Sequence, residues 1–140
     1  MLGTEIHDGM FLKILWDGAS RTIFIDWKEA TAGMTDDDFK AALTLFAHCV
    51  EKQKAHAILV DVSQFRYKMG PGLQEWRVKN ISPRYYAAGV RRFAFLFPVG
   101  VAVPPMMNQS APGESFLTRG FNGLGDAMTW LKEADSHGTR

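Results

Sequence analysis

Two segments near the start of the chain are rich in residues that favour β-strands. They cover residues 10–16 and 21–27, and the Asp-Gly-Ala-Ser sequence between them is typical of a short turn. In the second segment Ile23, Ile25 and Trp27 fall at alternate positions, so one face of that strand is the more apolar. This pattern predicts that the chain opens with a β-hairpin.

A helical pattern follows the predicted hairpin. Thr35 precedes three aspartates, an arrangement that caps a helix and places acidic groups beside the positive end of its dipole. Phe39, Phe46 and Val50 then recur at helical spacing. Together these features predict a helix that begins after Thr35 and ends near Lys54.

Two runs that are almost entirely apolar follow later in the chain: residues 57–62, in which Asp61 is the one polar residue, and residues 93–97. Runs without polar alternation are typical of strands that are buried on both faces in a parallel sheet. Between them, Pro71 suits the first turn of a helix, and Pro83 is expected to stop that helix or to kink it. Because crossovers of this kind are right-handed, both strands are expected to lie parallel in one sheet.

The last third of the chain predicts a loop, an edge strand and a helix. Residues 98–113 contain four of the six prolines and indicate a long loop or a poorly formed short helix. Residues 114–121 indicate an edge strand, and residues 124–131 carry the apolar face of a final helix. Residues 134–140 are expected to form a polar tail.

The complete pattern predicts one α/β domain that covers residues 1–140, with a core from about residue 10 to about residue 133. We expect about five strands in a mixed, mostly parallel sheet. The sheet opens with the hairpin and carries helices packed mainly on one face.

Composition and charge fit a compact domain and argue against several classes of partner. The 140 residues include 16 Lys and Arg against 15 Asp and Glu, and 46% are hydrophobic. A net charge of +1 supplies no field that attracts nucleic acid or anionic lipid. The first residues lack the pattern of a secretory signal, and no apolar run reaches the roughly eighteen residues of a membrane span. Since the single Cys49 also fits a reducing compartment, we expect a cytoplasmic protein.

Several stretches of the sequence resemble one known family. They are MTDDDFKAAL in the first predicted helix, ILVDVSQF followed by LQEW, AGVRRFAFLF, and FNGLGDAMTWL near the end. Together they span nearly the whole chain and resemble the STAS family (sulfate transporter and anti-sigma factor antagonist), in its stand-alone bacterial branch. The resemblance implies a mixed sheet with helices on one side and a tendency to self-associate.

The resemblance also bears on regulation. In the anti-sigma factor antagonists, a strand that ends in Asp, an aliphatic residue and Ser is followed by an Asp-Ser pair whose serine takes a phosphate. Here Asp61, Val62 and Ser63 match the first part, but Met69 and Gly70 stand in place of the pair. Glycine has no hydroxyl, so we expect no phosphorylation switch. Ser63 is expected to cap the end of its strand.

No combination of residues indicates a metal site, a cofactor site or a catalytic site. The four histidines include no pair four residues apart, and there is no pair of cysteines. Asp61, Ser63 and His56 are near in sequence, but no glycines form the tight turn that exposes a serine nucleophile. Gly123 and Gly125 fit a turn and a helix start better than a phosphate loop. We therefore expect no catalytic residue, no metal and no cofactor.

Apolar and aromatic side chains after two of the predicted strands form the main candidate for a binding surface. The parallel arrangement of the STAS-like branch implies that both segments meet at one end of the sheet, where such side chains adapt to different partners. The alternative is ordinary core beneath a loop. The candidates are Phe65, Tyr67, Met69, Leu73 and Trp76 in the corner, and Val101, Val103, Met106 and Met107 in the loop.

Two functions remain open at this point. The first is a non-enzymatic STAS-like regulatory or interaction domain that acts by protein contact, as a homodimer or with a regulatory partner. The alternative is binding of a small apolar or lipid-like ligand in a pocket between the corner at residues 63–76 and the loop at residues 98–113. Enzymatic activity ranks third, and we expect neither a nucleic-acid partner nor stable membrane insertion.

Overall fold

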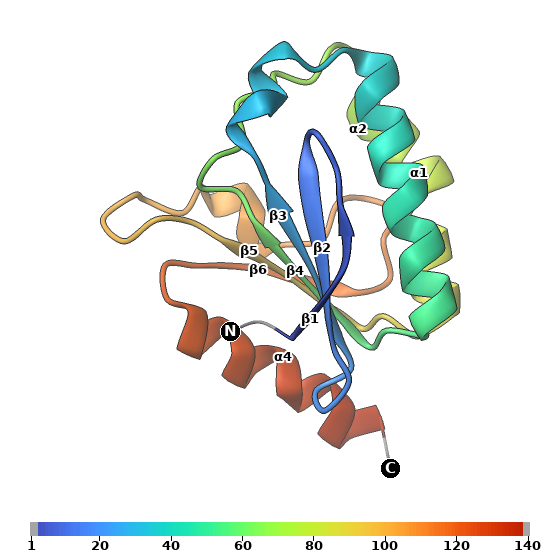
Figure 1. Cartoon of the computed structure of the whole chain (residues 1–140). Coiled ribbons are helices and arrows are strands. Elements are labelled where there is room, and N and C mark those ends of the chain that lie inside the picture. The colour runs from blue at the N-terminus through green and yellow to red at the C-terminus, as the bar shows by residue number, and fades with distance from the viewer. Residues whose placement is uncertain (1–2, 139–140) are drawn as a thin grey trace.

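The protein, for which we use a computed structural model describing residues 3–138, is built on a six-stranded sheet (Figure 1). The strands follow one another across the sheet in chain order. The first two pairings are antiparallel and the next three are parallel, so the sheet is mixed and mostly parallel, as predicted. The strands are β1 (Thr4–Asp8), β2 (Leu12–Asp17), β3 (Thr22–Trp27), β4 (Ala57–Asp61), β5 (Arg92–Leu96) and β6 (Leu117–Phe121).

Strand β1 is the sixth strand and was not indicated by the sequence pattern. Ile6 is the sole aliphatic residue among its five, so the segment shows neither alternation nor an apolar run. It pairs with β2 around a β-bulge between Glu5 and His7. The predicted opening hairpin is confirmed as β2 and β3, which pair from Leu12 opposite Trp27 to Asp17 opposite Thr22.

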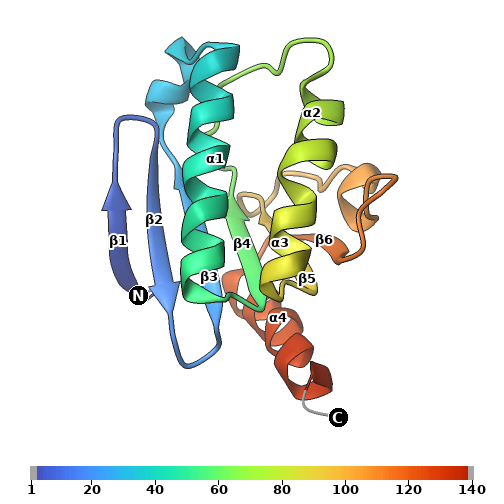
Figure 2. The same ribbon diagram turned by 90° about the vertical axis from the view of Figure 1, so that its right-hand side faces the viewer.

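Helices α1, α2 and α3 cover one face of the sheet, and α4 covers the other (Figure 2). The prediction of helices mainly on one face is therefore confirmed. Helix α4 continues into the segment expected to be a polar tail, of which residues 139–140 lie outside the described residues. The helices are α1 (Asp36–Gln53), α2 (Leu73–Asn80), α3 (Ser82–Ala88) and α4 (Leu124–Gly138), with short 3₁₀ helices η1 (Glu29–Gly33) and η2 (Pro105–Asn108).

Helix α1 begins and ends where the sequence predicts. The Thr35 hydroxyl accepts the Asp38 backbone N–H at 3.1 Å, and the Asp38 carboxylate accepts the Thr35 N–H at 3.0 Å. This reciprocal capping box satisfies two of the backbone donors that a helix start leaves open. The helix ends at Lys54, which adopts the left-handed conformation with φ of 54°.

Strand β4 is buried on both faces, as predicted. Ile58 and Val60 belong to the larger core beneath α1 to α3, whereas Ala57 and Leu59 belong to the smaller core beneath α4. A strand with alternate residues in two cores favours apolar side chains on both faces, which explains the apolar run from Ala57 to Val60.

The predicted second helix is divided into α2 and α3 at Ile81. Pro83 lies in the first turn of α3, where its missing N–H costs nothing and its ring does not have to fit inside a continuous helix. The break keeps Leu73 and Tyr85 in the same core, at 3% and 2% exposed.

The long segment between β5 and β6 contains the 3₁₀ helix η2 and packs on β6. Gly120 is essential for this packing, because a Cβ at that position would lie 2.3 Å from Val103 Cγ1. The Gly120 N–H is bound by the Asn108 side-chain oxygen at 3.0 Å. The segment thus covers part of the outer strand and engages one of its unpaired backbone donors.

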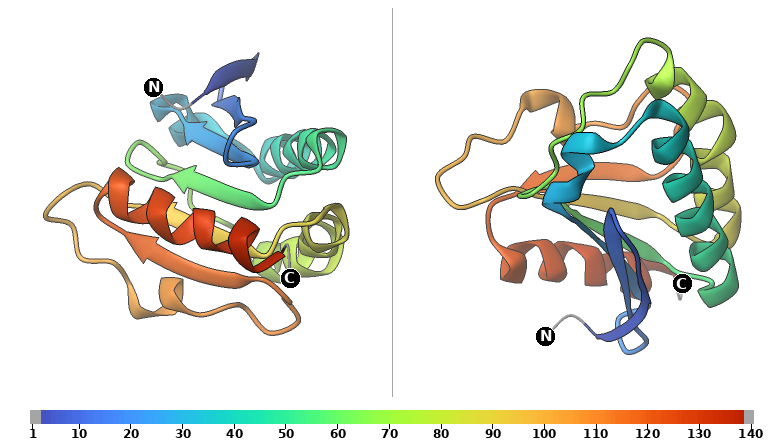
Figure 3. Two further views of the ribbon diagram at one scale, coloured as in Figure 1. Left: turned by 90° about the horizontal axis from the view of Figure 1, so that it is seen from below. Right: turned by 45° about the horizontal axis from the view of Figure 1, so that its top comes forward.

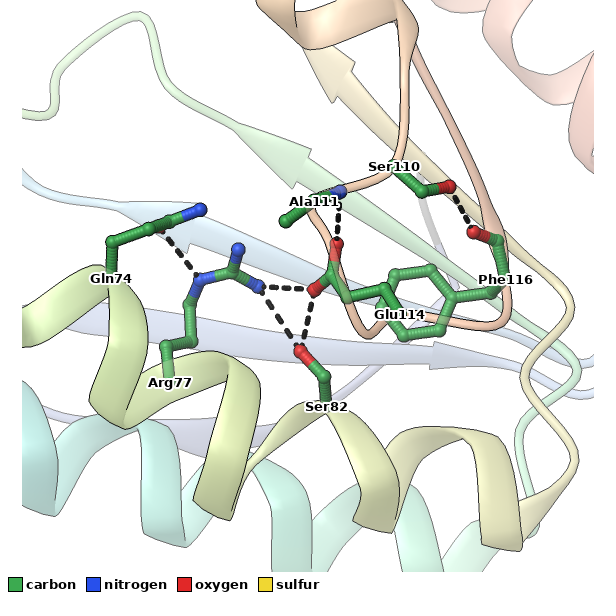
Figure 4. Close-up of polar contacts among 7 residues, drawn as sticks. All are labelled: Gln74, Arg77, Ser82, Ser110, Ala111, Glu114 and Phe116. Atoms are coloured by element: carbon green, nitrogen blue, oxygen red, sulfur yellow. Dashed lines mark hydrogen bonds and ion pairs between the residues drawn. The ribbon is translucent and has the colours of Figure 1, made fainter.

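A buried cluster around Glu114 joins the same segment to α2 and α3 (Figure 4). The Glu114 side chain is 3% exposed and accepts from Arg77 Nη1 at 2.9 Å, from the Ser82 hydroxyl and from the Ala111 backbone N–H at 2.9 Å. Arg77 is oriented further by Gln74 Oε1 at 3.3 Å. Because its hydrogen-bonding groups are largely satisfied, the cluster is a well-formed buried ion pair.

We expect Glu114→Gln to lower the free energy of unfolding by about 3 kcal/mol, because it leaves the Arg77 charge buried without its counter-charge. The matched control is Glu51→Gln, which removes the exposed ion pair with Arg84 and should cost less than about 1 kcal/mol. Urea unfolding of both variants measures the difference. Equal losses would show that the Glu114 cluster does not stabilise the loop more than a surface pair does.

Candidate functional site

The end of β4 is shaped by a local turn between Asp61 and Ser63. Asp61 Oδ1 accepts both the Ser63 backbone N–H at 2.9 Å and the Ser63 hydroxyl at 2.7 Å. Ser63 therefore has the local capping role that the sequence analysis expects. The turn holds both side chains at the carboxyl edge of the parallel strands, the edge at which open α/β sheets generally bind ligands.

The corner that follows is fixed by aromatic packing rather than open to solvent. The Phe65 ring lies 5.1 Å from Trp27, and the Tyr67 ring stacks on Phe39 at 5.2 Å between centroids. The Arg66 backbone N–H also binds the Thr31 hydroxyl at 2.8 Å. These contacts attach the corner to α1 and η1, so its aromatic residues are partly buried and pack against the larger core.

The other candidate residues of the corner divide between core and surface. Leu73 is 3% exposed within the larger core, and Trp76 packs against that core with the Lys40 ammonium 5.5 Å from its ring centre. Met69 is exposed at 46%.

The loop candidates lie elsewhere in the fold. Val103 and Met107 pack beside Gly120 on β6. The corner contacts β3, and strands β4 and β5 lie between β3 and β6. The side chain of Met106 lies outside the described part of the structure. The two groups of candidates therefore lie on opposite sides of the parallel strands. Phe65, Tyr67 and Leu73 pack in or against the larger core, which agrees with the alternative interpretation of these residues as core.

A hollow lies at the carboxyl edge of β4, β5 and β6, between Ser63 and the start of the long loop. Its volume is about 200 Å³. Figure 3 shows the loop after β5 and the first turn of α4 projecting together beyond the ends of these strands. Of the nine residues proposed for the corner and the loop, none whose side chain is described lines it. The lining residues are Asp61, Ser63, Leu96, Phe97, Pro98, Val99, Asn122 and Leu124.

The rim of this hollow is apolar and exposed. Val99 is 88% exposed, Val101 46% and Leu124 37%. Asn122 holds the rim in place, because its amide nitrogen donates to the backbone oxygens of Pro98 at 2.9 Å and Val101 at 2.7 Å. The loop conformation also uses Gly100, whose φ of +87° is one that glycine adopts without strain.

A pair of carboxylates adjoins the hollow. Asp26 and Asp61 are register partners on neighbouring parallel strands, so their side chains leave the same face of the sheet. Burial raises the pKa of Asp26, and the negative charge of Asp61 raises it further. The positive charges of Lys13 and Lys28 act in the opposite direction.

The geometry does not assemble catalytic or metal-binding groups around Ser63. His56 precedes β4 whereas Asp61 ends it, which separates them by roughly 16 Å of extended strand. His56 instead lies beside Arg21, whose Nε is 3.2 Å from its Nε2. Within residues 3–138, as far as their side chains are described, no group of three His, Cys, Asp or Glu is placed to hold a metal ion.

Gly70, which the STAS resemblance aligns with a phosphorylated serine, lies against a carboxylate. A Cβ added to Gly70 would be 2.6 Å from Asp36 Oδ2, and Asp36 already accepts the Tyr67 hydroxyl. A side chain at this position would have to displace Asp36, and a phosphate there would face its negative charge.

Comparisons with protein-family models, with curated proteins and with solved structures found no match for this chain. The similarity to the STAS family therefore stays a prediction. No helix in the described part of the chain combines the length and apolar character needed to cross a membrane.

Sequence reasoning considered Asp61 and Ser63 for catalysis but did not assign them to a binding site, and it did not single out the other residues that line the hollow. Asn122 and Leu124 follow β6, and Pro98 and Val99 follow β5. The signal that could have found them is their position directly after strands that run parallel to β4, because the carboxyl ends of parallel strands share one edge.

The Tyr67 contact predicts a pH dependence of stability. Burial and the hydrogen bond donated to Asp36 raise the pKa of Tyr67 from 10.0 to about 12. The unfolded chain therefore loses this proton first, so the stability contributed by Tyr67 is complete below pH 10 and is lost as the pH rises toward about 12.

We expect the difference in unfolding free energy between the natural protein and Tyr67→Phe to shrink as the pH rises from about 10 to about 12. Urea unfolding at a series of pH values measures it. Burial also raises the pKa of Tyr85, but Tyr85 is present in both proteins, so its contribution cancels in the difference between their unfolding free energies. A difference that is constant with pH would contradict the assignment.

Proposed function

We propose that this protein is a non-enzymatic, cytoplasmic, STAS-like interaction domain that acts by protein contact at the carboxyl edge of its sheet. One observation carries the proposal: the exposed apolar side chains Val99 and Leu124 line a hollow that holds polar groups, and the exposed Val101 lies in the loop that Asn122 binds beside it. Exposed apolar side chains that gather on one part of a surface are typical of sites where proteins bind one another.

The size of the hollow favours protein contact over a small apolar ligand. Pockets that enclose drug-sized ligands generally measure about 300–1,000 Å³. The hollow measures about 200 Å³, and a second one beside Ser82 and Glu114 measures about 170 Å³. Both volumes suit a side chain of a partner better than an independent lipid-like molecule.

The proposed contact does not use phosphorylation of the kind found in anti-sigma factor antagonists. Gly70 occupies the position of the serine, and Asp36 lies against it. A partner would therefore be released by competition or by changes in its own concentration. A second copy of the chain and a regulatory protein are both candidates for this partner.

Site-specific photo-crosslinking tests the proposed surface. A benzophenone amino acid at position 99 should give a discrete crosslinked product in cells, and Val101→Asp should abolish it by placing a charge in the rim. The matched control carries the same group at Leu117, which is also apolar and 57% exposed but lies on β6 away from the hollow.

Mass spectrometry of the product identifies the partner, and an adduct of two copies of this chain identifies self-contact. Equal products from positions 99 and 117, or a product that persists in Val101→Asp, would contradict the proposed surface.

A further inference from the structure

The polar side chains that line the hollow have their donors engaged and their acceptors free. The Ser63 hydroxyl donates to Asp61 Oδ1 at 2.7 Å, and the Asn122 amide nitrogen donates to two backbone oxygens of the rim. Among the described residues, no partner engages Asp61 Oδ2 or Asn122 Oδ1. These groups select a ligand that is rich in N–H donors.

The charge of the site also favours a ligand with N–H donors, in particular a cationic one. The lining residues include the Asp61 carboxylate and no Lys or Arg. Asp26 adds a second carboxylate beside Asp61, and no hydrogen bond or ion pair engages Asp26 within the described residues. The raised pKa of Asp26, caused first by burial and then by Asp61, reflects repulsion that a nearby cation would relieve.

The amino end of α4 borders the same hollow and by itself would favour an anion. Asp126, however, lies in the first turn of this helix and offsets its dipole. Together with Asp26 and Asp61 it supplies three carboxylates at this edge. Lys13 and Lys28 also act on Asp26, but each is paired with another carboxylate, Glu5 and Asp8 respectively.

We propose, resting on the protein contact proposed above, that the partner segment inserts one lysine or arginine side chain into the hollow, with apolar residues on either side of it. The cationic group lies against Asp61 and Asn122. The flanking apolar residues contact Val99, Val101 and Leu124.

The size of the hollow agrees with the insertion of one basic side chain between apolar neighbours. A hollow of about 200 Å³ accommodates the head of one long side chain, whose stem then passes between the rim residues. The apolar rim excludes water from the ion pair, which strengthens it and makes the basic residue a centre of the interaction.

A titration with defined peptides tests the proposal on the full chain. The probes are Ac-Leu-Arg-Leu-NH₂, the same peptide with neutral citrulline in place of arginine, and the same peptide with glutamate. Citrulline has nearly the shape of arginine without its charge. Amide shifts in ¹H–¹⁵N NMR spectra report both the affinity and the location of binding.

We expect the arginine peptide to shift the amides of residues 61–63, 97–101 and 122–124 and to bind about tenfold more tightly than the citrulline peptide. Asp61→Asn should remove that preference, because it deletes the charge but keeps an oxygen that accepts from Ser63. The control Glu75→Gln removes one exposed negative charge on α2 and should leave the preference unchanged.

Equal binding of the arginine and citrulline peptides, tighter binding of the glutamate peptide, or shifts confined to other residues would overturn the proposal. These outcomes are separate from the crosslinking result. A crosslink at position 99 without arginine selectivity would keep the protein contact and remove the basic partner, whereas loss of the crosslink would remove the contact surface itself.

Discussion

The fold depends on the need to cover β4 on both faces. Its alternate residues enter two cores, with Ile58 and Val60 on one side and Ala57 and Leu59 on the other. Strands β3 to β6 advance across the sheet in one direction, and right-handed crossovers between them place every connecting helix on the same face. The opposite face would stay exposed without a further element. Helix α4 supplies it by placing Ala127 and Leu131, both almost fully buried, against the smaller core.

The same arrangement creates the candidate site. Parallel strands that advance in register end at one edge, so the residues after β4, β5 and β6 are brought together although they are far apart in sequence. Helix α4 must start near this edge in order to run back across the sheet, and it brings Asn122 and Leu124 with it. On the other face, the Glu114 cluster holds the end of the long loop against α2 and α3. The hollow is therefore a consequence of how the second face is covered.

The parts of the fold that could be predicted are those in which local pattern and burial agree. The cap at Thr35, the continuous apolar run of β4 and the break near Pro83 each have a cause within a few residues of the chain. Strand β1 could not be predicted, because its pairing with β2 depends on a neighbouring strand and not on its own five residues.

The site was predicted less well for a related reason. Aromatic and methionine residues mark both core and binding surfaces, and the sequence does not show that Phe65 and Tyr67 pack on α1. The capping role of Ser63 could be predicted because its turn with Asp61 is local, although neither residue was assigned to a binding site. Asn122 and Val99 join them through register across two further strands, which no local pattern reveals.

The distribution of donors and acceptors at this edge supports the proposed role in recognition. A serine acts as a nucleophile when a base removes its proton and nearby donors stabilise the negative charge that develops. Here the side-chain donors of Ser63 and Asn122 are already used to hold the turn and the rim. What remains toward solvent is a set of oxygen acceptors next to two carboxylates, which would oppose developing negative charge. The same set stabilises a positive charge, so the bonds that build the hollow also decide what it can bind.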